Sequence, residues 1–326
     1  ERGETSFTAM DPPDHTHYRK LLTKHFTVKR IAALRPAVEA IVADLIEKFS
    51  ALPQPADLVQ QLAYPIATRT MCHLIGVPYT DHEWFQERAE VRSVMDADPA
   101  DAAQATQDLL DYVDTLIGLR LDNPQDDLLS KLTHELVVTG VLTRSELVAI
   151  VRLLLTAGHE TTATMIGTGT FVLLSHPDQL AELRADSGLD SGVNSGLLQG
   201  AVEELLRYIS MLHITVVRRA KAETELGGQR ICAGDGLIAN PAAANKDPDA
   251  FADPDTFDIH RDARHHVAFG FGVHQCLGQP VARLELQAVF GTLFSRLPNL
   301  RLAIDADEVD FNNSNLVGVR SLPVCW

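Results

Sequence analysis

One cysteine, Cys276, lies in a glycine-rich stretch, residues 269–278, that reads Phe-Gly-Phe-Gly-Val-His-Gln-Cys-Leu-Gly. A helical pattern from Pro280 to Leu297 follows, so backbone N–H groups and the helix dipole favour an ionised sulfur there. The glycines of the stretch lack a Cβ, which lets the backbone approach something flat and bulky. A thiolate that ligates a haem iron needs such an arrangement.

Other uses of this stretch have to be weighed against that one. An isolated cysteine is most often a buried, inert small side chain. A Rossmann phosphate loop is not supported, because Gly270-x-Gly272 lacks the third glycine at the required spacing. Zinc is not supported either, because His274 and Cys276 are two residues apart and no second Cys-x-x-Cys pair occurs in the sequence. The inert cysteine and the haem ligand both stay open at this point.

A hexapeptide of unusual composition lies inside the longest predicted helix, residues 143–175. Residues 157–162 read Ala-Gly-His-Glu-Thr-Thr. A mid-helix glycine costs about 1 kcal/mol relative to alanine, and paired threonines are poor helix formers. Such residues in an otherwise good helix indicate either a function or a kink or close packing contact. The zinc motif His-Glu-x-x-His is excluded because the last position is Ala163.

An acid and an arginine, Glu204 and Arg207, lie three residues apart on one face of a further predicted helix. Pairs of this kind are usually ordinary surface pairs that contribute a few tenths of a kcal/mol. On its own, this pair indicates no function.

Taken together, these motifs resemble those of the cytochrome P450 family. Residues 269–278 match its haem-binding loop, Phe-x-x-Gly-x-x-x-Cys-x-Gly, in full. Residues 157–162 resemble its oxygen-activation motif, and Glu204-x-x-Arg207 resembles the Glu-x-x-Arg motif of its K helix. The resemblance extends from Met10 to the end of the chain, and the run at 263–282 looks most like soluble actinobacterial members.

The resemblance implies catalytic roles for Glu160 and Thr161, which would relay protons toward oxygen bound at the iron, where the helix of this family bulges. It implies that Glu204 and Arg207 are buried and structural. We expect Arg261 to be the third member of that structural group.

The resemblance also implies haem b (iron protoporphyrin IX) as cofactor, with Cys276 as the ligand to the metal. A buried pair of propionates needs charge-assisted donors, and arginine supplies a fork for carboxylates. The cofactor-binding residues that it implies are His15, Arg19, Ala157, Arg218, Phe269, Gly270, His274, Cys276 and Gly278.

The activity implied is that of a haem-thiolate monooxygenase that inserts one atom of O2 into an apolar, natural-product-like substrate such as a macrolide, polyketide, terpenoid or steroid-like compound. Substrate-binding residues placed by family topology are Val94, Met95, Leu153, Leu154, Leu212, Ile214, Leu316 and Val317. Apolar residues at helical spacing are more often core than pocket. A peroxide-driven haem-thiolate peroxygenase and a non-enzymatic haem sensor remain alternatives.

No flavin or nicotinamide motif occurs in the sequence, so we expect a ferredoxin and its reductase to supply electrons. Such a partner would dock on the thiolate side, where four bases could form a basic patch or could simply be a solvated face. These bases are Lys20, Lys24, Arg264 and Arg283.

The elements that position these residues are mostly helical. Apolar periodicity and breakers predict helices at 14–26, 35–52, 58–75, 81–95, 101–121 and 126–138. A capping box at 143–146 opens the helix over 143–175, and residues 186–200 read as a loop. Extended segments are predicted at 214–220, 224–226, 229–231 and 315–324, with a Gly-Gly turn inside a hairpin. The predicted fold is therefore mainly α with a small β portion, the cytochrome P450 fold.

Composition sets the remaining bounds. The chain has 326 residues and a formal net charge of −16, which argues against nucleic-acid binding. Its 4 cysteines show no framework spacing, as expected in a reducing cytoplasm. No apolar run is long enough to cross a membrane, and no signal peptide is visible. We expect one domain over residues 1–326, N-terminally incomplete by roughly 80–90 residues.

Overall fold

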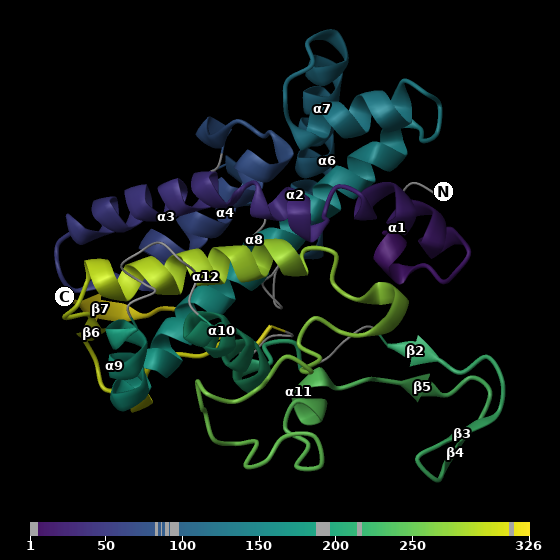
Figure 1. Ribbon diagram of the computed structural model, residues 1–326. Coiled ribbons are helices and arrows are strands. Elements are labelled where there is room, and N and C mark those ends of the chain that lie inside the picture. Colours follow the sequence, from purple (N-terminus) through teal and green to yellow (C-terminus); the bar gives the residue numbers. More distant parts are fainter. Residues whose placement is uncertain are drawn as a thin grey trace.

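The structure, a computed structural model, describes residues 6–81, 84–85, 87–88, 91, 98–186, 196–213, 217–312 and 316–326. The fold is mainly α with small β portions, as predicted (Figure 1). The helices that carry the argument are α1 (Asp14–Thr23), α2 (Val28–Ala32), α3 (Arg35–Ser50), α4 (Tyr64–Ile75), α6 (Pro99–Asp122), α7 (Leu128–Leu132), α8 (Arg144–Ser175), α9 (Pro177–Ala185), α10 (Gly196–Ile209), α11 (Pro241–Ala244) and α12 (Gln279–Arg296).

Helix α8 is the central element. The predicted capping box is present, since the Glu146 N–H donates to Thr143 Oγ1 at 3.2 Å and the Thr143 N–H donates to Glu146 Oε2 at 2.8 Å. With 32 residues, α8 spans about 48 Å, and it ends before Pro177. It packs against α4, α6, α10 and α12 (Figure 1). The prediction for this helix is confirmed.

The other helices differ from their predictions chiefly at their ends. Helix α1 ends at Thr23 rather than at 26, and α3 ends two residues before the predicted boundary. The segment predicted over 58–75 is a π-helical turn, Val59–Ala63, followed by α4, which ends at Ile75 and is capped by Gly76 with φ of 95°. The helix predicted at 126–138 is likewise α7 followed by a π-helical turn, Thr133–Val137. Helix α6 confirms the helix predicted at 101–121, and the one at 81–95 lies partly outside the described residues.

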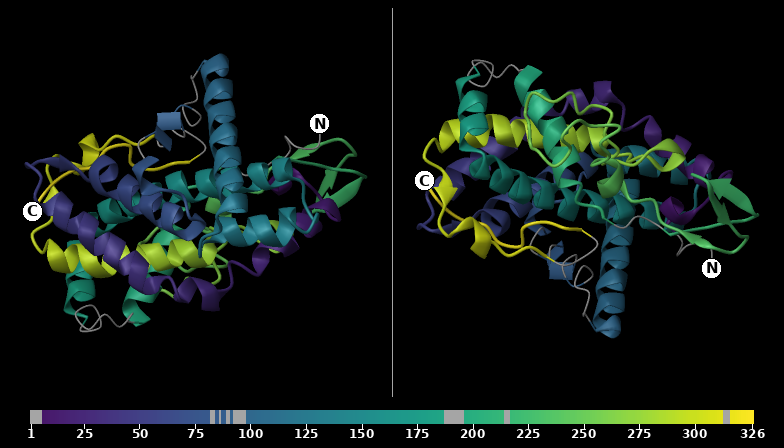
Figure 2. Two further views of the ribbon diagram at one scale, coloured as in Figure 1. Left: turned by 90° about the horizontal axis from the view of Figure 1, so that it is seen from above. Right: turned by 90° about the horizontal axis from the view of Figure 1, so that it is seen from below.

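The β portions lie at opposite ends of the molecule (Figure 2). At one end, β7 (Pro323–Cys325) lies between β1 (Ala56–Asp57) and β6 (Arg301–Leu302). At the other end, β2 (Arg218–Arg219) pairs with β5 (Gly236–Leu237), and β3 (Thr224–Leu226) pairs with β4 (Gln229–Ile231).

The hairpin prediction is confirmed, because Gly227 and Gly228 have φ of 58° and 76° in the turn. The strands predicted at 214–220 and 315–324 are too long. Of the described residues, the first forms only β2, and the second forms isolated bridges at Leu316 and Val319 before β7 begins. No helix in the part of the chain that the structure describes is long and apolar enough to cross a membrane.

A buried ion pair fastens α10 to the irregular segment that follows the hairpins. Arg207 and Glu204 are joined by two hydrogen bonds of 2.7 and 2.8 Å, and both side chains are 0% exposed. Arg207 Nη1 donates to the carbonyls of Asn245 and Pro254, each at 2.8 Å. Arg261 Nε donates to Glu204 Oε1 at 3.2 Å, so the structure brings together the three residues that sequence reasoning grouped.

Asn245 extends this network toward the cysteine stretch. Its side chain is fully buried, and its amide nitrogen donates to Ser210 Oγ at 2.8 Å. Its amide oxygen accepts the Val267 N–H at 2.7 Å, two residues before the stretch begins. The ion pair and Asn245 together hold both ends of the segment 245–267.

We predict that Arg207→Lys lowers the free energy of unfolding by about 3–5 kcal/mol, because a lysine leaves carbonyl and carboxylate partners unmatched in a buried site. Denaturant unfolding measures the change. Arg230→Lys is the matched control, because Arg230 pairs with Glu223 where the two side chains are 70% and 60% exposed. That control should change stability by less than about 0.5 kcal/mol. Equal effects at both positions would contradict the prediction.

Candidate functional site

The Cys276 sulfur lies between a tight loop and the start of α12. The Cys276 N–H donates to the Phe269 carbonyl at 2.9 Å and closes the loop. Gly270 and Gly272 have φ of 70° and 80°, a region that favours glycine. Solvent reaches the cysteine side chain. The loop therefore presents the sulfur to a ligand from a fixed backbone position.

Two opposing effects act on the Cys276 thiol. Desolvation by the surrounding protein raises its pKa, while backbone N–H groups of Gly278 and Gln279 and the charges of Arg19 and Arg283 lower it. The net pKa shift is upward, so the helix start and the neighbouring bases alone do not produce the ionised sulfur that the sequence predicted. A bound metal cation deprotonates a coordinating thiol outright, so a metal ligated by Cys276 would ionise this sulfur.

Four predicted cofactor-binding basic residues lie close to one another, and the charge of one of them, Arg19, acts on Cys276. His15 and Arg19 lie on α1, the His274 ring is centred 4.1 Å from the His15 ring, and Arg218 begins β2. Burial and then the charges of Arg19 and Arg218 lower the pKa of His15. Burial and then His15 and Arg218 lower the pKa of His274. The structure thus brings these bases together.

This group of bases fits a ligand that carries carboxylates. His15 is 2% exposed, yet neither of its ring nitrogens has a hydrogen-bond partner. Asp11, whose charge reaches His15, is paired with Lys221 at 3.0 Å. Within the described ranges, no three His, Cys, Asp or Glu side chains are grouped to hold a metal ion. An iron at Cys276 would therefore bring most of its ligands with it, as in haem.

The predicted catalytic residues lie in the middle of α8. The Thr161 hydroxyl donates to the Ala157 carbonyl at 2.8 Å, which leaves its oxygen free to accept a hydrogen bond. Glu160 is half-buried beside it, and Ala157 is exposed. The helix is α-helical without interruption here, so the bulge that the resemblance implied is not a break in the helix.

Close packing explains the glycine of the hexapeptide. A Cβ on Gly158 would lie 2.5 Å from Met71 Sδ on α4. His159 is 1% exposed and packs against the rings of Tyr64 and Phe85, at centroid distances of 5.1 and 5.7 Å. Burial lowers the pKa of His159 to about 4. The packing contact that sequence reasoning left open is therefore real at Gly158.

The structure brings together three of the predicted substrate-binding residues. Leu212 and Leu316 form an isolated antiparallel bridge, and the Val317 N–H donates to the Met211 carbonyl at 2.8 Å. Leu153 and Leu154 are half-buried on α8. Val94, Met95 and Ile214 lie outside the described residues.

Gly318 is a residue that sequence reasoning missed. A Cβ there would lie 2.2 Å from Thr164 Cγ2 and 2.9 Å from Thr168 Oγ1, both on α8. The neighbouring Val319 N–H donates to Thr168 Oγ1 at 3.0 Å. Gly318 therefore sets how closely the segment with Leu316 and Val317 approaches α8. The only sequence signal for this contact is that residue 318 is a glycine.

The expected basic patch is largely neutralised by local acids. Lys24 pairs with Glu135 at 2.5 Å and Arg264 pairs with Asp262 at 2.6 Å. Arg283 pairs with Glu203 at 2.6 Å. Lys20 alone of the four forms no ion pair within the part that the structure describes.

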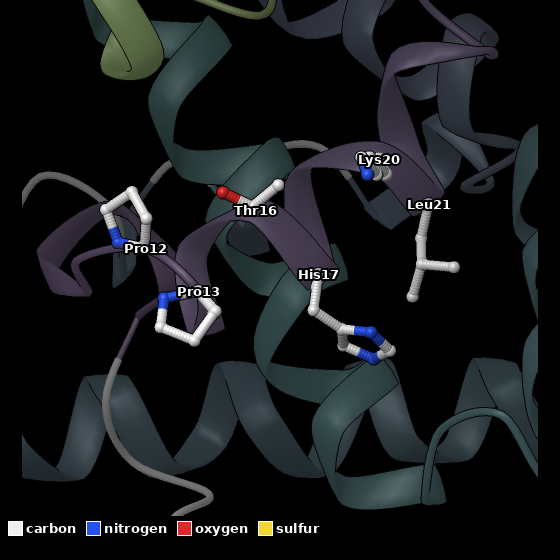
Figure 3. Close-up of a pocket in the computed structure, with 6 residues that line it drawn as sticks. All are labelled: Pro12, Pro13, Thr16, His17, Lys20 and Leu21. Carbon is white, nitrogen blue, oxygen red and sulfur yellow. The ribbon is translucent and has the colours of Figure 1, made fainter.

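Lys20 lines a surface hollow of about 780 Å³ along α1 (Figure 3). Its other lining residues are Pro12, Pro13, Thr16, His17 and Leu21. None of the predicted catalytic, cofactor-binding or substrate-binding residues lines this hollow.

Comparison with known proteins finds a family and relatives that match most of the chain. The family model described as "Cytochrome P450" matches residues 91–320. Cytochrome P450-SU2 of Streptomyces griseolus is 44% identical over 98% of this chain and 77% of the relative. Pentalenic acid synthase of Streptomyces avermitilis is 45% identical over 97% of this chain and 77% of the relative.

A solved structure shares the fold over the whole chain. The crystal structure of mycinamicin VIII C21 methyl hydroxylase from Micromonospora griseorubida, bound to mycinamicin VIII, aligns with a TM-score of 0.92 and 41% identity. The alignment covers 100% of this chain and 81% of that one.

We predict that His159 makes the protein less stable as the pH is lowered. Its pKa of about 4 in the folded protein lies below the usual value of 6.5, so protons bind the unfolded chain first. Stability is therefore full above pH 6.5 and is lost as the pH falls toward 4, by roughly 2 kcal/mol at pH 5.

The measurement is the change in unfolding free energy between pH 7 and pH 5. His159→Phe should lose about 2 kcal/mol less than the wild type over this interval. His17→Gln, at an exposed histidine, should follow the wild type. A His159→Phe variant with the wild-type pH dependence would contradict the assignment.

Proposed function

The chain belongs to the cytochrome P450 family, whose members are monooxygenases, and we propose that it hydroxylates an apolar, natural-product-like substrate with electrons from a ferredoxin and its reductase. The observation that carries the proposal is the group of four basic side chains near Cys276, one of which is the buried His15. Haem b held there would supply oxygen activation and oxidation of the substrate.

Different residues would bind different parts of the proposed haem. Cys276 would ligate the iron, with its sulfur held by backbone N–H groups of Gly278 and Gln279. His15, Arg19, Arg218 and His274 would bind the propionates by charge-assisted hydrogen bonds. The remaining proposed contacts with the haem are those of Ala157, Phe269, Gly270 and Gly278.

Proton delivery is assigned to α8. Monooxygenation consumes two protons and two electrons, puts one oxygen atom into the substrate and releases the other as water. The Thr161 oxygen, with its hydrogen donated to Ala157, can accept a hydrogen bond from a water and so hold it in place. Glu160, adjacent and half-buried, would pass protons from solvent to that water.

The substrate class is supported by the proposed apolar contacts and by the relatives. Backbone pairing brings Leu212, Leu316 and Val317 together, and these residues would form an apolar wall. One similar solved protein holds mycinamicin VIII, according to its description. Since no flavin or nicotinamide motif occurs in these 326 residues, separate electron-transfer proteins are proposed as donors.

A first prediction tests the ligand. The reduced carbonyl adduct of the wild type should show the absorption of a thiolate-bound haem, and Cys276→Ser should lose that absorption, because a hydroxyl does not replace the thiolate. Cys232→Ser, at another exposed cysteine, is the control and should keep it. A wild-type adduct that absorbs like an imidazole-bound haem would refute the proposal.

A second prediction tests proton delivery. Thr161→Ala should release more hydrogen peroxide per NADPH consumed, at the expense of product, because the held water is lost. The control is Thr156→Ala, whose hydroxyl makes the same bond to a carbonyl four residues earlier, at 3.0 Å. Thr156 lies about 140° around α8 from Thr161. Unchanged coupling in Thr161→Ala would remove this residue from the role.

The substrate is found by spin-shift titration of the ferric protein with lipophilic natural products. Turnover with peroxide alone that equals turnover with reductant would favour the peroxygenase. Failure of every compound to shift the spin state would favour the sensor.

A further inference from the structure

Glu203, next to the buried Glu204, is the centre of a second charged cluster that sequence reasoning missed. Its two carboxylate oxygens accept hydrogen bonds from Arg283 Nε at 2.6 Å and Arg283 Nη2 at 2.8 Å. His266 Nε2 lies 3.1 Å from Glu203 Oε2. The side chains of Glu203 and His266 are 11% and 1% exposed. Burial raises the pKa of Glu203, but the hydrogen bonds from His266 and Arg283 and the charge of Arg283 outweigh burial, so the pKa is about 2.

The hydrogen bonds fix the tautomer of His266. Its Nδ1 accepts the Ala268 N–H at 3.0 Å, so this nitrogen carries no proton in the neutral ring. The proton is then on Nε2, which donates to Glu203. A neutral His266 therefore satisfies both neighbours, and the cluster of Glu203, His266 and Arg283 has no net charge.

The cluster contacts the loop that carries the sulfur. The Arg283 guanidinium lies 4.7 Å from the centroid of the Phe269 ring, and the Phe269 carbonyl accepts the Cys276 N–H. His266 lies three residues before Phe269 on the same loop. The charge of Arg283 also acts on the Cys276 sulfur. The cluster therefore acts on the sulfur both by packing on Phe269 and by charge.

We propose that Glu203 is a positioning residue that orients Arg283 on Phe269 and balances its charge, and so sets how strongly the Cys276 sulfur donates to the iron. The proposal rests on haem ligation by Cys276. His266 fastens the start of the loop, and Arg283 carries the effect of Glu203 to the sulfur.

The charge balance makes the effects of two substitutions opposite in sign. Glu203→Gln leaves the positive charge of Arg283 uncompensated near the sulfur, which favours the more negative ferrous state. Arg283→Gln leaves the negative charge of Glu203 instead, which disfavours that state. A purely structural role would loosen the loop in both variants and would not give opposite shifts.

The experiment is a redox titration of the holoenzyme, with the reduced carbonyl spectrum as a second readout. Relative to the wild type, Glu203→Gln should raise the reduction potential of the haem, and Arg283→Gln should lower it. The double variant Glu203→Gln with Arg283→Gln should return the potential toward the wild-type value. Shifts of the same sign in the two single variants, or no shift in either, would overturn the proposal.

A matched control removes the same chemistry elsewhere. Glu182 on α9 pairs with His260 at 2.8 Å, where both side chains are more than half exposed. Helix α9 lies at the far end of α12 from Cys276, where Arg184 stacks on Phe294 at 5.6 Å (Figure 1). Glu182→Gln should leave the potential and the spectrum unchanged.

Loss of haem from a single variant still gives a decisive result. An uncompensated charge in a partly buried site is costly, and removing both members of the pair relieves that cost. If Glu203→Gln holds no haem, the double variant should recover haem binding; a double variant that also binds none would refute the charge balance. The wild-type carbonyl spectrum tests ligation by Cys276 separately.

Discussion

The buried ion pair between Glu204 and Arg207 is the constraint on which the rest of the structure depends. Neither side chain touches solvent, so each must find all its hydrogen-bond partners inside the protein. Arg207 finds them in main-chain carbonyls of residues 245–256, which form no regular element that could hold itself in place. The pair thus fixes the position of an irregular segment. Asn245, through its hydrogen bond from the Val267 N–H, fixes the chain just before the cysteine loop.

Two adjacent acids on α10 serve two different parts of the molecule. Successive residues point about 100° apart on a helix. Glu204 therefore faces the segment at 245–261, while Glu203 faces α12 and the start of the cysteine loop. Helix α10 therefore fixes the path of the chain into the cysteine loop, through Glu204, and places a negative charge beside Arg283, through Glu203. This explains how a loop with three glycines can keep a sulfur in one position.

Local signals were sufficient for some elements and not for others. The capping box at Thr143 and the Gly227-Gly228 turn were predicted correctly because their geometry is decided within a few residues. The strand predicted at 315–324 was too long. Within it, Gly318 approaches α8 closely, and this tertiary contact cannot be read from the local sequence. The burial of Glu204, and the pairing of Lys24 with Glu135 across 111 residues, likewise depend on contacts distant in sequence. The loop motif and the family resemblance indicated the cysteine and its basic neighbours, but not Glu203 or His266.

The site is locally basic, although the whole chain carries a net negative charge. The protein has a formal net charge of −16, yet His15, Arg19, Arg218 and His274 gather where Asp11 is already paired. Burial and mutual repulsion lower the pKa values of both histidines, and desolvation raises the pKa of the Cys276 thiol. A complementary ligand would stabilise the charged form of each group: carboxylates that of the histidines, and a cation that of the thiol. A metal-bearing macrocycle with two carboxylates would meet both demands at once, because it carries both a cation and carboxylates. These basic side chains would favour binding of the cofactor, while the cluster of Glu203, His266 and Arg283 would set the donor strength of the sulfur.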